Sequence, residues 1–256
     1  MKSSPPTSVA PFVEARDLRK TIGNQEILRG VTFDVASGET LVILGASGGG
    51  KSVLLRHILG LMRPDSGTLR VDGTEITELS ERELFPVRRK IGMLFQDGAL
   101  FDSMTVAENV AFPLRERGLR DEREISDRVE AALAMVGLGE HLEKMPVLLS
   151  GGMRKRVALA RAAVTEPLGM LYDEPTAGLD PIASDSINQL IRRLRVRLGV
   201  SAIVVTHDLR SAYEVAQRII FLREGSIYFE GTPDAIRGCG DPVVRNFIEG
   251  VSGEKP

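Results

Sequence analysis

A glycine-rich segment of the chain has the residue types needed to bind a phosphate group. Residues 45–52 fit the pattern G-x-x-x-x-G-K-[ST], in which a loop surrounds phosphate oxygens with backbone N–H groups. The eight members are Gly45, Ala46, Ser47, Gly48, Gly49, Gly50, Lys51 and Ser52. We expect Lys51 to reach the β- and γ-phosphates of a nucleotide and Ser52 to ligate Mg²⁺.

The residues on either side supply the elements that this loop requires. Thr40–Leu44 is a short apolar run rich in β-branched residues, which predicts a buried strand. From Lys51 to Leu61, apolar side chains recur at helical spacing. The first N–H groups of a helix have no partner within it, so they can donate to an anion.

A second apolar run, Met170–Tyr172, ends in two carboxylates, Asp173 and Glu174. Parallel strands of an open α/β sheet present their carboxyl ends to the ligand. We therefore expect Asp173 to hold Mg²⁺, mostly through water, because this ion keeps part of its hydration shell. Glu174 is then placed to orient and deprotonate an attacking water molecule.

Two further polar residues end predicted strands, and a third begins a predicted helix. His207 follows Ala202–Val205, and Gln96 follows Ile91–Phe95. Ser150 has the residue type of a helix N-cap, with Gly151 and Gly152 as a turn before a helix over Met153–Val164. Three consecutive cations of this helix are expected to form a solvated basic face: Arg154, Lys155 and Arg156.

The order of these segments resembles the ATP-binding subunit of ABC transporters, from about residue 12 to residue 250. The resemblance implies an α/β P-loop NTPase (RecA-like) core with an antiparallel β subdomain and an α-helical subdomain. It also implies ATP hydrolysis, with ATP and Mg²⁺ as cofactors and a homodimer of ATPase subunits. In that scheme His207 senses the γ-phosphate, and Gln96 touches Mg²⁺ and water while relaying the nucleotide state.

The same resemblance assigns further nucleotide contacts. Ser150, Gly151 and Gly152 would face the ATP of the other subunit, so that each site needs two chains. Asp180, in the segment Gly178-Leu179-Asp180, joins the nucleotide-binding residues. Ile22 stands where the family usually has an aromatic residue that stacks on adenine. Aliphatic contact remains, but the π face, which contributes roughly 1–3 kcal/mol per base in nucleic-acid sites, is lost.

The chain divides by pattern into a tail, one ATP-binding domain and a second tail. Residues 1–11 are rich in Ser and Pro and predict a disordered N-terminal tail. The domain covers 12–250, beginning with strands broken by the Gly23-Asn24 turn, and residues 251–256 form the C-terminal tail. The stretch from about 97 to 166 lacks strand patterns and predicts the helical subdomain, with helices over Thr105–Arg117 and Asp121–Val136.

The segment Gln96–Pro113 suggests which transporter is involved. In the family this region forms the groove for a permease, and Phe101, Met104 and Val106 are its predicted lining, although Val106 fits a core position equally well. The run Gly98–Met104 resembles the ATPases of Mce-associated, Mla-type phospholipid transporters. That resemblance implies an integral-membrane permease, a Mce-domain lipid-binding protein and a small STAS-domain subunit as partners. It places the chain at the cytoplasmic face of the inner membrane.

Composition limits the alternatives. The 256 residues carry a net charge of -2 and one cysteine, which argues against nucleic-acid binding and against an internal disulfide. No apolar stretch approaches the roughly 18–20 residues of a membrane helix, and no signal peptide is recognisable. Two other readings stay open: an ABC ATPase for amino acids, lipoproteins or metals, and a soluble ABC protein of DNA repair or translation. A small GTPase is disfavoured because the guanine motif Asn-Lys-x-Asp is missing.

Overall fold

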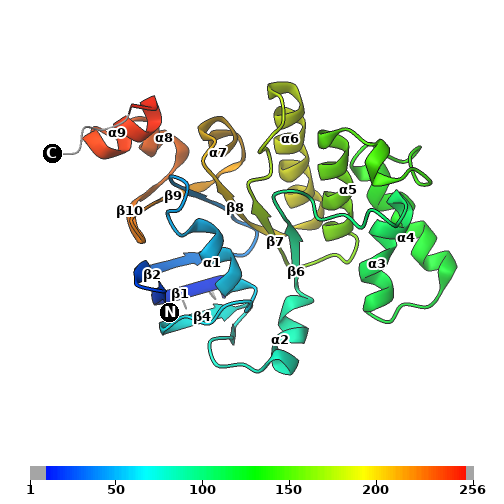
Figure 1. The fold of residues 1–256 in the computed structure, drawn as a ribbon, viewed down its shortest axis with the longest axis horizontal. Helices are drawn as coiled ribbons and strands as arrows, with labels where there is room; N and C mark the ends of the chain where they lie inside the picture. Colours follow the sequence, from blue (N-terminus) through cyan, green and yellow to red (C-terminus); the bar gives the residue numbers. More distant parts are fainter. Residues whose placement is uncertain (1–9, 252–256) are drawn as a thin grey trace, which may run out of the picture.

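The computed structural model describes residues 10–251, and its centre is a six-stranded sheet (Figure 1). In spatial order the strands are β10 (Ser226–Gly231), β9 (Arg218–Arg223), β3 (Thr40–Leu44), β8 (Ser201–Thr206), β7 (Gly169–Asp173) and β6 (Ile91–Leu94). All neighbours are parallel except β10, which is antiparallel to β9. The carboxyl ends of β3, β6, β7 and β8 therefore meet at one edge. Most of the two expected tails lies outside the described residues.

A second, antiparallel sheet of four strands covers one side of the first. Its order is β2 (Gln25–Val35), β1 (Val13–Ile22), β4 (Ser66–Val71) and β5 (Thr74–Glu75). Ile22 pairs with Gln25 across the two-residue turn at Gly23, where φ is +60°. This sheet confirms the antiparallel β subdomain expected from the sequence.

The helices lie around the two sheets, and α3–α5 stand apart at the right of Figure 1 as the helical subdomain. They are α1 (Lys51–Ile58), α2 (Glu81–Arg88), α3 (Val106–Glu116), α4 (Glu122–Met135), α5 (Gly151–Ala163), α6 (Pro181–Leu198), α7 (Leu209–Val215), α8 (Pro233–Arg237) and α9 (Pro242–Glu249), with a 3₁₀ turn at Pro146–Leu148. The expectation that α1 extends to Leu61 was wrong. It ends at Ile58, because Gly60 has φ +63° and turns the chain.

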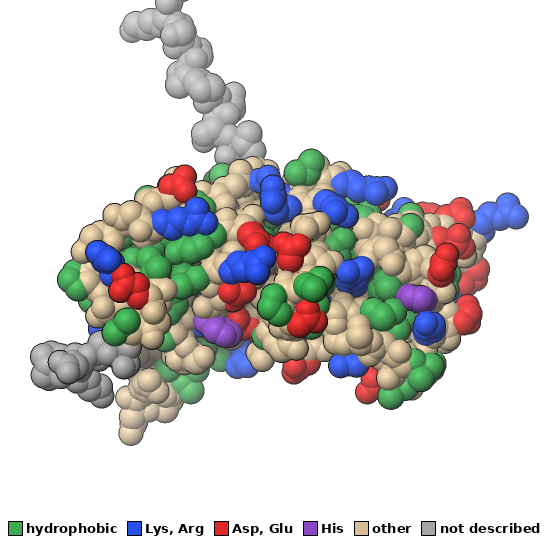
Figure 2. All heavy atoms as spheres, turned by 90° about the horizontal axis from the view of Figure 1, so that it is seen from above, with side chains coloured by type: hydrophobic (Ala, Val, Ile, Leu, Met, Phe, Trp, Pro, Cys, Tyr) green, Lys and Arg blue, Asp and Glu red, His purple; other side chains and the backbone are tan. Residues whose placement is uncertain are grey.

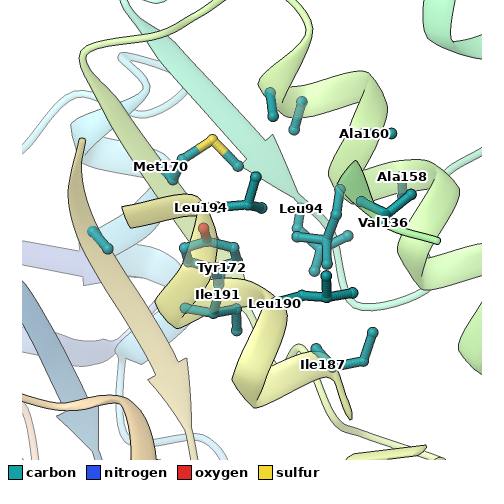
Figure 3. Close-up of a cluster of buried hydrophobic side chains, with 14 of the residues drawn as sticks. Leu94, Val136, Ala158, Ala160, Met170, Tyr172, Ile187, Leu190, Ile191 and Leu194 are labelled. Atoms are coloured by element: carbon teal, nitrogen blue, oxygen red, sulfur yellow. The ribbon is translucent and has the colours of Figure 1, made fainter. Parts of the chain in front are cut away.

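The hydrophobic core has one layer on each face of the six-stranded sheet. Along β3, Val42 and Leu44 belong to the layer on the helical side, whereas Leu41 and Ile43 belong to the layer between the sheets. This alternation follows from the period of two in a strand. Figure 3 shows the helical-side layer, in which Tyr172 of β7 lies among side chains of α6. Complete burial raises the pKa of the Tyr172 hydroxyl far above its ordinary value.

Acidic and basic side chains are mixed on the surface seen in Figure 2. On this face Lys and Arg side chains are interspersed with Asp and Glu side chains instead of gathering in one block. Charges of opposite sign therefore lie side by side on this face, as the small net charge of -2 would suggest. The face offers no continuous surface of one sign.

Gly169 begins β7 at the point where the β subdomain touches the sheet. A Cβ atom built on Gly169 would overlap the ring of Phe12, and even the third-nearest ring carbon would be only 2.8 Å away. Phe12 is itself buried. The ring of Phe12 thus occupies the space that any side chain at position 169 would need, which accounts for glycine here.

We predict that Gly169→Ala lowers the free energy of unfolding by about 1–3 kcal/mol, the usual cost of overpacking a core. Chemical denaturation of the purified protein measures this change. In a Phe12→Leu background, which removes part of the ring, the same substitution should cost less. Equal costs in the two backgrounds would show that Phe12 does not set the constraint.

Candidate functional site

The phosphate-binding loop lies between the end of β3 and the start of α1. Gly50 is the N-cap of α1 with φ +94°, and no side chain caps the helix. Only glycine adopts such a backbone readily. A Cβ atom on Gly45 would overlap the carbonyl oxygen of Leu222 in β9. The loop therefore has its shape because β9 lies against it, and its helix end remains open to an anion.

Lys51 is buried inside this loop. Its Nζ donates to the carbonyl oxygens of Gly45, at 2.8 Å, and Ala46, at 3.0 Å, and lies 3.9 Å from Oε1 of Glu174. Burial lowers the pKa of Lys51, an effect that the nearby carboxylates of Glu174 and Asp173 oppose. The structure thus brings Lys51 and Glu174, two of the predicted site residues, together.

Ser52 and Asp173 form the second pair of the site. Ser52 Oγ donates to Asp173 Oδ1 over 3.2 Å, and burial raises the pKa of Asp173. Two oxygen ligands side by side fit a hard cation such as Mg²⁺. Within residues 10–251 no group of three or more His, Cys, Asp or Glu side chains could hold a metal ion. A Mg²⁺ ion here would therefore also need nucleotide phosphates and water.

Glu174 and His207 form the third pair, at the ends of β7 and β8. His207 Nδ1 lies 2.9 Å from Glu174 Oε2. Because an ionised carboxylate only accepts, Nδ1 carries the hydrogen of this bond. Thr206 Oγ1 also donates to Oε2, over 3.2 Å. Glu174 has φ +46°, a conformation that is uncommon for a non-glycine residue and is maintained only by surrounding contacts.

One of those contacts comes from Lys155, where the sequence prediction was wrong. Lys155 was expected on a solvated basic face, but only 6% of it is exposed, and Nζ donates to the backbone oxygen of Glu174 over 3.2 Å. Arg154 is exposed, and Arg156 is half-buried and donates to Ser186. Lys155 shares the buried stripe of α5 with Ala158, Leu159 and Ala162, a helical spacing that could have revealed it.

The other predicted residues lie around this centre without touching it. Ser150 is the N-cap of α5, as expected, and its Oγ accepts from Met153 N. Asp180 is exposed and caps α6 by accepting from Ile182 N and Ala183 N, both at 2.9 Å. Gln96 is exposed just beyond the end of β6, beside β7. Ile22 is 45% exposed, so an apolar surface is present at the expected adenine position.

A separate hollow of about 720 Å³ lies between α2, β6, α3 and α5. We call it the Phe101 groove; Phe85, Phe95, Phe101, Phe112, Arg117 and Arg161 are among its lining residues. Phe101 is 41% exposed, and its ring centroid lies 4.8 Å from that of Phe112. Met104 and Val106 are not among the lining residues. For Val106 the groove reading was wrong, because this residue is fully buried in the core.

Comparison with known proteins finds similarity to ATP-binding proteins of transporters. A family model described as "ABC transporter" matches residues 28–177. The "Probable ribonucleotide transport ATP-binding protein mkl" of Mycobacterium leprae is 42% identical over 238 residues, which are 93% of this chain and 69% of the relative. "Methionine import ATP-binding protein MetN" of Brucella abortus is 39% identical, over 98% of this chain and 68% of the relative. The chain thus spans about two thirds of these relatives.

Solved structures of ABC proteins have the same fold. The dimeric post-hydrolysis state of the ATP-binding cassette MJ0796, bound to ADP and Pi, has a TM-score of 0.79 and 34% identity, covering 86% of this chain and 98% of the other. The structure of CbiO1 from Clostridium perfringens, part of the ABC transporter complex cbiONQ, has a TM-score of 0.83 and 30% identity, covering 93% and 95%.

The buried ammonium of Lys155 leads to a prediction for the site. Lys155→Met keeps most of the apolar stem but removes the donor to the backbone of Glu174. We expect kcat for ATP hydrolysis to fall about tenfold, because small displacements of a reacting group are costly, while ATP affinity at the P-loop stays unchanged. Steady-state kinetics and nucleotide titration test this, with Arg154→Met as the exposed neighbour. Equal kcat in both variants would exclude the positioning effect.

Proposed function

Because the chain belongs to the ABC transporter family and is an ATPase that binds ATP, we propose that it powers phospholipid transport between bacterial membranes as part of an Mce-associated, Mla-type system. One observation carries the catalytic part of this proposal. Lys51, Asp173, Glu174 and His207 converge at the carboxyl edge of one parallel sheet. They come from the ends of two strands, β7 and β8, and from the start of α1, just after the loop that follows β3.

We assign binding of ATP to the P-loop. The N–H groups at the start of α1 surround the phosphates, and the Lys51 ammonium compensates the β- and γ-phosphate charge. Ser52 and Asp173 hold Mg²⁺ in this proposal, and the ion, when bound, neutralises charge on the phosphate oxygens. In the same proposal Gln96, just beyond the end of β6, contacts Mg²⁺ and water, and Ile22 covers the adenine.

We assign the chemical step to Glu174. Its carboxylate accepts a proton from the attacking water and orients that water. The hydrogen bonds from Thr206 and His207 occupy Oε2, so Oε1 is the oxygen left for the water. His207 senses the γ-phosphate in this proposal.

We further propose that two copies of the chain form each complete site. Ser150, Gly151, Gly152 and Asp180 are too peripheral to join the centre of their own chain, which suits contact with the nucleotide of a partner copy. Two of the similar solved structures are described as dimeric. In the dimer the N-terminal end of α5 would approach the γ-phosphate, where its N–H groups favour negative charge.

The Phe101 groove is the proposed docking site for the permease. Exposed aromatic side chains line it, and an apolar groove can receive the apolar face of a short helix. Among residues 10–251 there is no helix of the length and apolarity that membrane crossing needs. Contact with the membrane would then come through the permease, at the cytoplasmic face of the inner membrane. The Mce-domain lipid-binding protein and a small STAS-domain subunit complete the proposed complex, which includes no nucleic acid.

Amino-acid import is the second candidate function. It is favoured by the 39% identity to the methionine import protein, which extends over 98% of this chain. The residues from Gly98 to Met104 favour the phospholipid system instead. ATP chemistry is the same in both cases, so the partner and its cargo distinguish them.

Glu174→Gln tests the proposed base. We expect kcat to fall by at least about a hundredfold, because an amide cannot accept the water's proton at neutral pH, while ATP binding persists. Light scattering should show an ATP-dependent dimer. Glu166→Gln is the matched control, since Glu166 is an exposed glutamate that also has positive φ. Wild-type hydrolysis by Glu174→Gln would rule out its assignment as the base.

Phe101→Asp tests the groove. We expect unchanged nucleotide affinity and thermal stability but at least about tenfold less permease recovered on co-purification, because a charge would enter an apolar contact. Val196→Asp, at a site that is 74% exposed on α6, is the control. Mass spectrometry of the intact complex then identifies the cargo: bound phospholipid supports the proposal, and bound methionine supports the second candidate. A destabilised, aggregating Phe101→Asp variant would mean that Phe101 is a core residue.

A further inference from the structure

A buried polar cluster lies directly behind the Glu174–His207 pair. We call it the Asn188 cluster; it comprises Thr176, Asn188, Asp208 and Ser211. With Glu174 and His207 these side chains line a hollow of about 580 Å³. Asn188 is a polar exception on α6, whose other buried residues are Ile187, Leu190, Ile191 and Leu194. An apolar residue there would avoid the cost of desolvating an amide, so packing alone does not account for Asn188.

The members of the cluster form a continuous set of hydrogen bonds between α6 and α7. Asn188 Nδ2 donates to Ser211 Oγ over 3.0 Å and to Glu214 Oε2 over 2.9 Å. Ser211 Oγ donates to Asp208 Oδ2 over 2.5 Å. Thr176 Oγ1 lies 3.2 Å from Ser211 Oγ. Ser211 is thus the centre of the cluster, since it contacts each of the other three.

Asp208 connects the cluster to the catalytic carboxylate. Its backbone N–H donates to Thr206 Oγ1 over 3.0 Å, and Thr206 Oγ1 donates to Glu174 Oε2 over 3.2 Å. The other carboxylate oxygen of Asp208 accepts from Arg210 N at the start of α7. Both carboxylate oxygens of Asp208 are therefore held by hydrogen bonds. His207 is the residue directly before Asp208 in the chain.

The cluster also reaches the segment that leads to α6. Thr176 lies two residues after Glu174, and its backbone oxygen accepts from Leu179 N over 3.2 Å. One residue later Asp180 caps α6, the helix that carries Asn188. The cluster thus closes a ring that runs from Glu174 through Thr176 and α6 to Asn188, and back through Ser211, Asp208 and Thr206.

We propose that Asn188 and Ser211 are positioning residues for ATP hydrolysis, which fix Asp208 and thereby the geometry of His207 and Glu174. The proposal rests on the roles proposed above for Glu174 and His207. It goes beyond them because it assigns a part in hydrolysis to two side chains of α6 and α7 that are buried behind the site. Removing either one leaves the P-loop intact, so ATP binding is independent of the cluster.

Ser211→Ala and Asn188→Leu test this. We expect kcat to fall about tenfold in each, with the Kd for ATP within about twofold of wild type. The double variant should be no slower than the slower single variant, because both remove one network. Ser211→Thr, which restores a hydroxyl, should recover most of the lost kcat. A purely structural role would lower thermal stability without this split between kcat and Kd.

Ser201→Ala is the matched control. Ser201 is as buried as Ser211, and its hydroxyl makes two hydrogen bonds, with Gly38 N and Ala36 O, but it lies at the opposite end of β8 from His207. We expect it to lose stability and keep its kcat. Unchanged kcat in Ser211→Ala, or an equal loss in Ser201→Ala, would overturn the proposal. If Glu174→Gln is inactive while Ser211→Ala is fully active, only the cluster's role fails; an active Glu174→Gln removes the premise.

Discussion

The buried ammonium of Lys51 is the constraint on which the rest of the site depends. A cation out of water is unfavourable unless hydrogen bonds and opposite charge compensate it. Here the carbonyl oxygens of Gly45 and Ala46 accept from it, and Glu174 lies within 4 Å. Gly45 and Ala46 begin the P-loop and Glu174 follows β7, so the cation joins parts of the chain that are more than a hundred residues apart. An arriving phosphate would replace them with stronger negative charge.

The parallel sheet makes this convergence possible. Its strands carry apolar residues on both faces, and most of their polar side chains lie at or beyond the strand ends. Since β3, β7 and β8 run in the same direction, the first polar residues after each strand meet at one edge. Glu174 occupies a left-handed backbone conformation there. The bonds from Lys155 and Thr206 hold it in place, so tertiary contacts maintain the strained residue.

The helical-side core connects this edge with the remainder of the molecule. The α6 helix packs its apolar face on Tyr172 and its neighbours (Figure 3), while its N-terminus carries Asp180 and its middle carries Asn188. A displacement of α6 would therefore act on the segment after Glu174 and on the loop of His207 together. The Phe101 groove lies at the side of the same sheet, next to β6 and α5, so the proposed docking site and the nucleotide edge share these elements.

The sequence by itself determined the motifs, the strands that precede them and the class of fold, because these depend on short-range patterns. Strand periodicity, turn glycines and N-cap residues act within a few positions of one another. Thus β3, β7, β8 and the cap Ser150 were found, and so were α3 and α4. Helix ends were less certain: α1 stops at Ile58 because Gly60 turns the chain. The pairing of β9 with β3 was not predicted, although Ile219–Leu222 is an apolar run.

Only the tertiary structure decided which polar residues are buried and what they touch. Lys155 follows one cation and precedes another in sequence, yet it alone turns inward, because its helical stripe faces Glu174. Asn188 and Ser211 lie on different helices and meet only when α6 and α7 pack on the sheet. Gly169 is required because Phe12, the residue before β1, occupies the space that a side chain at position 169 would need. Such contacts join residues distant in the chain, and no local pattern encodes their partners.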